Sequence, residues 1–144
     1  MSFHDNSKAC KKAIRRAQEK WLYAVGELLV SAIRPLIPVD TSSLKTSLDY
    51  KVDIDKMEVI IGVGEHYAMY VEFGTGEYAE NGQGRKGGWM FKNYKTGDLI
   101  FTRGGHPKPY MRPGFRSQKQ NVKALLEKYL KEIGVEASVS FKKK

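Results

Sequence analysis

The sequence predicts a small α+β protein, and three observations lead to that prediction. Apolar residues spaced three and four apart between Lys8 and Arg34 indicate one long helix. Alternating apolar and polar residues from Tyr50 to Val63 indicate a β-hairpin, and a second helical stripe follows Pro113. We expect a long N-terminal helix and a C-terminal helix packed on one face of a small, mainly antiparallel sheet of about three to five strands, with a long hairpin-like loop insertion.

Length and composition limit the class of protein. With 144 residues and a single cysteine, the chain is expected to form one domain, residues 1–144, without an internal disulfide. The formal charge of +9 favours contact with polyanions, and a solvated basic surface is the equal alternative. No apolar run reaches the roughly 20 residues that cross a bilayer, and the first residues lack a secretory signal. We therefore expect a cytoplasmic protein that makes no membrane contact.

The first predicted helix, from Lys8 to Arg34, has one apolar face. Cys10 lies on this face, so we expect a small buried side chain and not a nucleophile. A helix of this length measures about 40 Å, which is longer than one small domain requires. Its apolar face either serves the chain's own sheet throughout or packs partly on a neighbouring subunit. The face comprises Cys10, Ile14, Ala17, Trp21, Val25, Leu28 and Ala32, widened by Leu22, Leu29 and Ile33.

Prolines and turn residues separate this helix from the hairpin. Pro35 and Pro38 end the helix, because proline lacks an amide hydrogen and clashes with the preceding turn. Asp40 or Thr41 is expected to cap a short helix over residues 43–48. Residues 68–73 are expected to add a third strand to the hairpin. The hairpin strands run through Tyr50, Val52 and Ile54 and through Val59, Ile61 and Val63, joined at Asp55 and Lys56.

Residues 77–108 differ in composition from the rest of the chain and are predicted to be an inserted loop. Glycine is frequent in this segment, and aliphatic residues are few. Residues 89–92 and 99–103 can pair around a turn at residues 95–98, which would form a hairpin projecting from the body. The insertion, above all residues 82–88, is expected to be mobile in the free subunit and to become ordered on assembly.

The closing helix is expected to begin at Pro113, because proline suits the first turn of a helix, and to end at Gly134. An edge strand over residues 137–141 would follow. Residues 1–7 and 142–144 are expected to be disordered. The apolar face of the closing helix comprises Val122, Leu125, Leu126, Tyr129 and Ile133.

Two short segments are too dense in aromatic, charged, glycine and proline residues for ordinary amphipathic patterning: residues 67–76, YAMYVEFGTG, and residues 109–115, PYMRPGF. Gly74 and Gly76 allow backbone angles closed to other residues, so they mark a fixed bend. Glu72, if buried, needs a partner. We expect it to accept hydrogen bonds from amides of the following turn or to pair with Arg112; an outward-facing position on an edge strand is the alternative. The aromatic residues are expected to form one cluster, in the core or at a subunit interface: Tyr67, Tyr70, Phe73, Tyr110 and Phe115.

No catalytic, metal or cofactor site is predicted. The glycines of residues 82–88 are not followed by Gly-Lys-Ser or Gly-Lys-Thr, which argues against a phosphate-binding loop. No Ser or Cys nucleophile lies in a recognisable elbow, and no Cys or His cluster has metal-ligand spacing. We expect a protein that is not an enzyme. A catalytic cluster assembled only by folding, as in a ribonuclease-like toxin, stays open as a third class.

Together with residues 38–48, PVDTSSLKTSL, the two dense segments resemble the head-tail joining or tail-completion proteins of long-tailed bacteriophages, the family typified by phage HK97. In that family a long helix leads to P-x-D-T-G-x-L-x-x-S, a hairpin, Y-A-x-Y-V-E-F-G-T, a variable loop, and P-F-L-x-P-A before a final helix. The resemblance covers residues 8–135, with Ser42 where glycine is usual and Gly114 where alanine is usual. The residues of this structural motif are Asp40, Thr41, Tyr67, Tyr70, Glu72, Phe73, Gly74, Thr75, Pro109, Tyr110, Arg112 and Pro113.

The resemblance implies a structural virion component of an active phage or a prophage. Such a protein would join the DNA-filled head to the tail, or complete the tail, at the neck, after synthesis in the host cytoplasm. It would act as a ring, a hexamer being one candidate, around the channel that double-stranded DNA crosses without sequence specificity. Its partners would be copies of itself and other neck and tail-tube proteins. Side chains expected to face neighbouring subunits or DNA are Arg85, Lys86, Trp89, Phe91, Arg103 and Lys108.

The alternative interpretation is a small basic nucleic-acid-binding protein. Trp89, Phe91 and Tyr94 would then stack on bases, beside the basic residues of the insertion. The sequence carries neither a helix-turn-helix nor an RNA-recognition signature. Tight oligonucleotide binding by the isolated monomer, falling steeply with salt, would favour this alternative.

Overall fold

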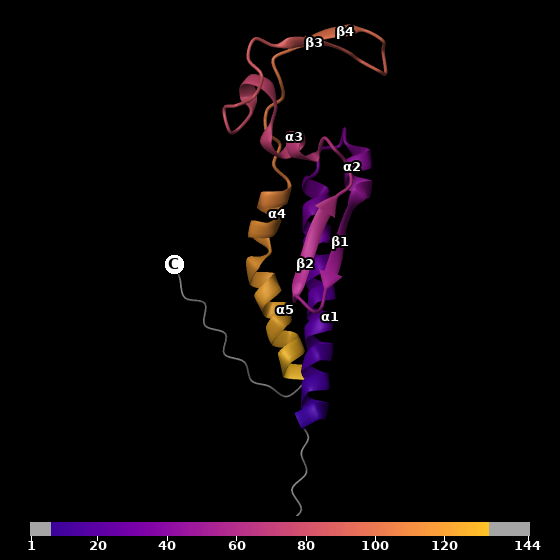
Figure 1. The fold of residues 1–144 in the computed structure, drawn as a ribbon, viewed down its shortest axis with the longest axis vertical. Helices are drawn as coiled ribbons and strands as arrows, with labels where there is room; N and C mark the ends of the chain where they lie inside the picture. Colours follow the sequence, from indigo (N-terminus) through magenta and orange to yellow (C-terminus); the bar gives the residue numbers. More distant parts are fainter. Residues whose placement is uncertain (1–6, 133–144) are drawn as a thin grey trace, which may run out of the picture.

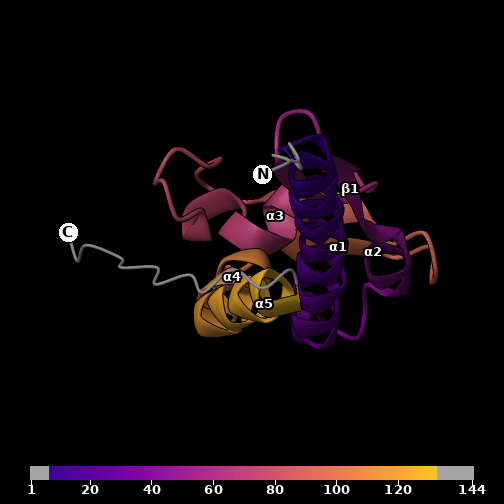
Figure 2. The ribbon, with the colours of Figure 1, turned by 90° about the horizontal axis from the view of Figure 1, so that it is seen from below.

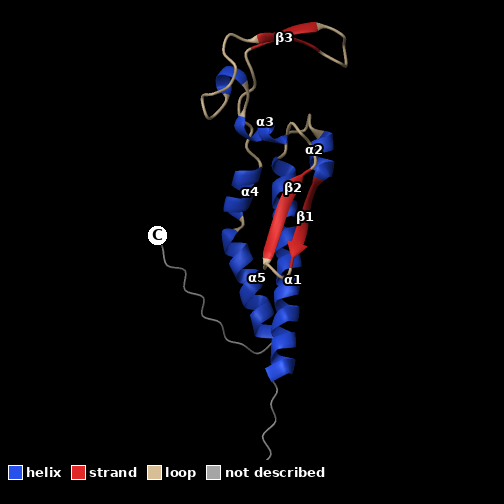
Figure 3. Cartoon of the chain, viewed as in Figure 1, coloured by secondary structure: helices blue, strands red, loops and turns tan. Residues whose placement is uncertain are grey.

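A computed structural model describes residues 7–132 and has the α+β fold that the sequence predicts. The molecule is elongated: helices and one hairpin form its body, and a second hairpin projects at one end (Figures 1 and 3). No helix in this described part is long and apolar enough to cross a membrane. The elements in order are α1 (Ser7–Ile33), η1 (Arg34–Leu36), α2 (Ser42–Ser47), β1 (Leu48–Asp53), β2 (Glu58–Val63), α3 (Ala68–Phe73), η2 (Gly76–Tyr78), β3 (Trp89–Lys92), β4 (Leu99–Thr102), α4 (Met111–Ser117) and α5 (Lys119–Glu132).

Helix α1 is the central element of the body. It contacts α4 and α5 on one side and the β1–β2 hairpin on another (Figure 2). Trp21 in α1 donates a hydrogen bond from Nε1 to the carbonyl oxygen of Val122 in α5, at 3.2 Å. The prediction placed both long helices on one face of a sheet; instead α5 packs chiefly against α1, and α1 covers the hairpin.

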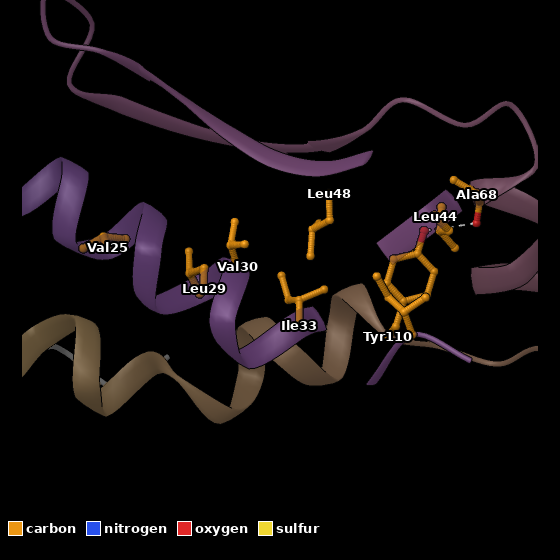
Figure 4. Packing of buried hydrophobic residues seen from close by; sticks show 9 residues of the cluster. Val25, Leu29, Val30, Ile33, Leu44, Leu48, Ala68 and Tyr110 are labelled. Carbon is orange, nitrogen blue, oxygen red and sulfur yellow. Dashed lines mark hydrogen bonds between the residues drawn. The ribbon is translucent and has the colours of Figure 1, made fainter. Parts of the chain in front are cut away.

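The hydrophobic core lies where the C-terminal half of α1 meets α2, β1, α3 and the start of α4 (Figure 4). Ile33, Leu44 and Leu48 are almost fully buried. Tyr110 is also buried, and its hydroxyl donates a hydrogen bond to the carbonyl oxygen of Ala68 at 3.3 Å. No residue of the 77–108 insertion belongs to this core cluster or to the side chains packed against it. The core of the body is therefore built without the insertion.

The predicted hairpins are confirmed, but the predicted sheet size is not. Strands β1 and β2 pair antiparallel, and the pairs Leu48–Val63, Tyr50–Ile61 and Val52–Val59 face the core. Strands β3 and β4 pair in the same way within the insertion. In the described residues each sheet has two strands, whereas we expected one sheet of three to five strands.

Residues 68–73 form helix α3 and not the predicted third strand. Helical spacing turns Ala68, Val71 and Glu72 inward and leaves Tyr70 and Phe73 exposed. Six residues form less than two helical turns, so their spacing favours a helix over a strand only weakly. The strand prediction was wrong because the conformation of these residues depends on the core against which Ala68 packs.

The closing helix begins earlier than predicted and has two parts. It starts at Met111, two residues before Pro113, and Gln118 separates α4 from α5. Pro113 lies in the first turn, where its missing amide hydrogen costs no helical bond. The expected stop at Gly134 with Ile133, the strand over residues 137–141 and the termini 1–6 and 142–144 lie outside the described residues. Ser7, also expected to be disordered, begins α1.

The first turns of α1 extend beyond the core. Cys10 is exposed, so its predicted burial is wrong. The reason is the length of the helix: its first buried residue is Ala17, and before it only Ile14 is half-buried. Within residues 7–132, nothing therefore covers the N-terminal part of the apolar face, as an intersubunit contact would require.

The connection from α1 to β1 follows the prediction with one difference. Helix α1 ends at Ile33, and Pro35 lies in η1. Thr41 occupies the N-cap position of α2, but its hydroxyl donates a hydrogen bond to the carbonyl oxygen of Pro38 at 2.6 Å and does not cap the helix. Asp40 is exposed.

Candidate functional site

The two dense segments of the sequence meet at the carboxylate of Glu72. This side chain, in α3, is 6% exposed. Its Oε2 accepts hydrogen bonds from the amides of Tyr110 at 2.7 Å and Met111 at 2.9 Å. Its Oε1 accepts from the amide of Arg112 at 3.2 Å and from Arg112 Nε at 2.9 Å. The predicted partner Arg112 is present, whereas the amides belong to the start of α4 and not to the turn that follows α3.

The Glu72 carboxylate also explains where α4 begins. The first amides of a helix have no partner within the helix. Tyr110, the N-cap residue, offers no side-chain cap, so Glu72 satisfies the amides of Tyr110, Met111 and Arg112 instead. Negative charge at a helix N-terminus is also favourable, because the partial charge of the helix is positive there. Helix α3 thus fixes the start and direction of α4.

Arg112 extends this contact to the inserted loop. Its Nη1 and Nη2 donate to the two carboxylate oxygens of Glu80, at 3.0 and 2.9 Å. The guanidinium carbon also lies 4.8 Å from the ring centre of Phe73, within range of a cation–π contact. Arg112 therefore links α3, α4 and the loop after η2 in one network of charges.

The network holds its three groups in their charged forms. Burial alone would raise the pKa of Glu72, but hydrogen bonds from the Met111 and Tyr110 amides and from Arg112 lower it below its usual value. Hydrogen bonds from Arg112 likewise lower the pKa of Glu80. Glu80 and Glu72 in turn raise the pKa of Arg112. These shifts are opposite to those of a proton-transfer site, whose groups titrate near the working pH.

The two ends of the insertion are joined beside this network. The amide of Thr75 donates to the carbonyl oxygen of Gly105 at 2.9 Å, and the Gly105 amide donates to Thr75 Oγ1 at 2.9 Å. The Glu77 amide donates to the Arg103 carbonyl oxygen at 2.9 Å, and the Arg103 and Glu77 side chains form an ion pair at 3.7 Å. These contacts hold the two ends side by side.

Gly74 and Gly76 form the fixed bend that the sequence predicts. Their φ angles are 76° and 62°, in the left-handed region that favours glycine. A Cβ on Gly74 would lie 2.8 Å from Pro107 Cδ and 2.9 Å from the Gly105 carbonyl oxygen. A Cβ on Gly76 would overlap the Arg103 carbonyl group. Both the backbone angle and the close approach of the returning chain therefore require glycine.

An open groove of about 990 Å³ lies beside α3. Its floor is the outer side of α3, where Met69 is 69%, Tyr70 62% and Phe73 44% exposed. Trp89 and Arg85, from the start of the insertion, line the groove as well, with the Arg85 guanidinium 5.5 Å from the Trp89 ring centre. The groove is thus an exposed, largely apolar surface next to the charge network.

The β3–β4 hairpin carries apolar side chains on both faces. Opposite residues share a face, so Met90 and Phe101 lie on one side and Phe91 and Ile100 on the other. All four are exposed, and Leu99 is 70% exposed. A two-stranded hairpin is marginally stable in water unless something covers it, and clustered exposed apolar residues are typical of interaction sites. This hairpin therefore has the character of an interface element.

The five aromatic residues of the two dense segments do not form the single cluster that the sequence predicts. Tyr110 lies in the core, whereas Tyr70, Phe73 and Phe115 are exposed. Tyr67 is half-buried, and its hydroxyl group contacts that of Ser43. The single cluster does not form because Tyr70 and Phe73 lie on the outer side of α3, away from the core that contains Tyr110.

The other predicted residues contribute mainly through the backbone or the surface. The Lys108 amide donates to the Val71 carbonyl oxygen at 2.8 Å, which adds a further link between the ends of the insertion and α3. Lys86 and Pro109 are exposed. In the described residues no group of three or more His, Cys, Asp or Glu side chains could hold a metal ion.

Two residues of the candidate site were not predicted from the sequence. Glu80 completes the charge network by pairing with Arg112. The folded loop brings these two distant residues together, so no local sequence pattern predicts the contact. Met69 lines the groove with Phe73, four residues later. A spacing of four residues is typical of a helix, and the expectation of a strand over residues 68–73 gave it no weight.

The fold and the site define a class of protein: a small α+β structural domain whose charge network anchors a projecting apolar hairpin. A comparison with known protein families matches residues 2–74 to the family described as "Bacteriophage HK97-gp10, putative tail-component". The match runs from the N-terminal residues through α3 to Gly74, which is half of the chain. The chain belongs to this family of bacteriophage tail components. Comparisons with curated proteins and with solved structures give no match.

Proposed function

We propose that this chain joins the head of a tailed phage or prophage to its tail, or completes the tail, at the neck of the virion. Several copies form a ring around the DNA channel, after synthesis in the host cytoplasm. Membership in a family of phage tail components supports a structural role in the virion. The charge network agrees with a structural role, because Arg112 and Glu80 tie the loop after η2 to α3 and α4.

The observation that carries this proposal is the β3–β4 hairpin. Its exposed apolar faces suit contact with other subunits, and the bend at Gly74 and Gly76 holds its base in place. Since the core of the body does not include the hairpin, assembly is the function that explains its composition. Its partners are further copies of this chain and other neck and tail-tube proteins.

The basic character of the chain suits a ring through which DNA passes. The sequence has 25 Lys and Arg residues against 16 Asp and Glu residues. Phosphate contacts by such residues carry no base information, so DNA of any sequence is tolerated. We assign double-stranded DNA as a passing partner and not as a specific ligand.

Deletion of the gene from the phage or prophage that encodes the chain tests this function. Filled heads and separate tails should accumulate, and wild-type protein supplied in trans should restore joined particles. In the matched variant, an Asn-Gly turn replaces residues 90–101. The turn connects Trp89 to Thr102, its partner across the strands, so the exposed hairpin is removed. This variant should fail to restore joining. Normal joining of heads and tails without the chain would refute the proposal.

A second candidate function is direct binding of nucleic acid by the monomer. Phe91 is 43% and Tyr94 100% exposed on the hairpin, so both rings are accessible to bases. Fluorescence anisotropy with short oligonucleotides distinguishes the two functions. Micromolar or tighter binding at physiological salt, lost in a Phe91→Ala, Tyr94→Ala variant, would favour this second candidate. Weak, sequence-independent binding that does not change in the variant is what the neck function predicts.

A further inference from the structure

Helix α3 and the insertion together present two exposed apolar surfaces. One is the apolar groove floored by Met69, Tyr70 and Phe73. The other is the two-faced apolar hairpin of β3 and β4. Two views at right angles place the tip of the hairpin on one side of the body and the loop after η2, which lines the groove, on the other (Figures 1 and 2).

The hairpin cannot occupy the groove of its own chain. Trp89, the first residue of β3, itself lines the groove, and the strands lead away from that point. Folding back would require breaking the contacts at its base, where Gly76 packs against the Arg103 carbonyl and Thr75 pairs with Gly105. A β3–β4 hairpin can therefore reach the groove only from another molecule.

We propose that the β3–β4 hairpin of one copy docks in the α3 groove of a second copy. This inference rests on the proposed function, since it names the contact that builds the ring. The two surfaces differ and lie on opposite sides, so each copy donates to one neighbour and accepts from the other. Such head-to-tail contacts form a closed ring when the rotation between copies closes.

Charged side chains border both apolar surfaces. The hairpin carries Lys92 and Lys95 beside its apolar residues, and the turn between its strands carries Asp98. The rim of the groove carries Glu80 and Arg85. Each surface is thus an apolar centre with a polar border, the arrangement that protein interfaces commonly have.

Disulfide trapping in assembled particles tests this contact. The exposed Cys10 is first replaced, Cys10→Ser, so that the chain has no native thiol. Copies carrying Tyr70→Cys in the groove and copies carrying Leu99→Cys in the hairpin are then expressed together in the gene-deleted phage. After mild oxidation, disulfide-linked dimers should form in the joined particles only when both variants are present, and a reductant should abolish them.

The matched control replaces Tyr70→Cys by Ile60→Cys, because Ile60 is similarly exposed, at 54%, but lies on β2 away from the groove. It should give no dimer. Met69→Cys with Phe101→Cys serves as a second pair if the first pair does not assemble. Joined particles that yield no dimer from either pair overturn the docking while leaving the neck function intact. A cross-link from Tyr70→Cys only to a different virion protein also overturns it. Normal joining in the deletion strain instead refutes the proposed function.

Discussion

The carboxylate of Glu72 accepts four hydrogen bonds, three from the first amides of α4 and one from Arg112 Nε. This single side chain therefore caps a helix, neutralises a cation and ties α3 to α4. The sequence indicated its importance, because a glutamate within an apolar segment requires a partner. It also named Arg112 as a partner. The sequence could not reveal the helix cap, because the amides that donate hydrogen bonds to Glu72 are 38 to 40 residues away in the chain.

Replacing Glu72 by alanine should lower the free energy of unfolding by about 1–3 kcal/mol, because buried amides and the Arg112 guanidinium lose their acceptor. Urea denaturation followed by circular dichroism measures the loss. Glu80→Ala is the matched control: it removes the other partner of Arg112, but the side chain of Glu80 is 47% exposed, so the loss should be much smaller. Equal losses for the two variants would contradict the assigned role of Glu72.

The contribution of Glu72 should depend on pH. Because its pKa is lower in the folded than in the unfolded state, its ionised form stabilises the fold above the unfolded value of about 4.3. This stabilisation is lost as the pH falls through the lower, folded pKa. The difference in unfolding free energy between the wild type and Glu72→Gln should therefore be constant near neutral pH and shrink below about pH 4. A difference that stays constant down to pH 2 would exclude this linkage.

Gly114 allows α4 to approach α1 closely. A Cβ at this position would overlap Cγ1 of the fully buried Ile33 and lie 3.3 Å from its Cα. Overpacking of this kind costs about 1–3 kcal/mol, which exceeds the gain of about 1 kcal/mol that alanine offers within a helix. Gly114→Ala should therefore lower the melting temperature. In a double-mutant cycle with Ile33→Ala the two losses should be less than additive; a more stable Gly114→Ala protein would contradict the account.

At the scale of the elements, segments with a clear apolar period or a recognisable turn were predictable, and helix α3 was not. Helix α1 and the β1–β2 hairpin formed close to the expected bounds, because each follows its own apolar period over many residues. The β3–β4 hairpin was also predicted correctly from its turn and strand residues. Helix α3 was mistaken for a strand, and the groove went unrecognised with it. Its six residues take their conformation from the core that they meet and not from their own pattern.

Removal of the hairpin should leave the body folded. The core cluster contains no residue from the insertion, so the variant that joins Trp89 to Thr102 by an Asn-Gly turn loses no core contact. Its far-ultraviolet circular dichroism should retain the helical signal, and its melting temperature should stay within a few degrees of the wild type. A collapse of the melting temperature would mean that the hairpin is part of the folding unit and not an assembly element.

At the scale of the whole molecule, the structure separates a body that contains the core from an insertion that contributes nothing to it. The insertion projects at one end of the body around α1 (Figure 1), and part of it lines the groove beside α3. The charge network of Glu72, Arg112 and Glu80 fixes the insertion to the body. The sequence predicted the insertion and its anchoring segments, but the relative position of groove and hairpin emerges only from the folded chain.

A reconstruction of the assembled virion neck by electron microscopy tests the central claim most directly. Particles carrying the wild-type chain should show it as a closed ring around the DNA channel between head and tail. In each copy the β3–β4 hairpin should contact the α3 groove of the adjacent copy. Copies of this chain located elsewhere in the virion, or arranged in the neck without contacting one another, would contradict the account.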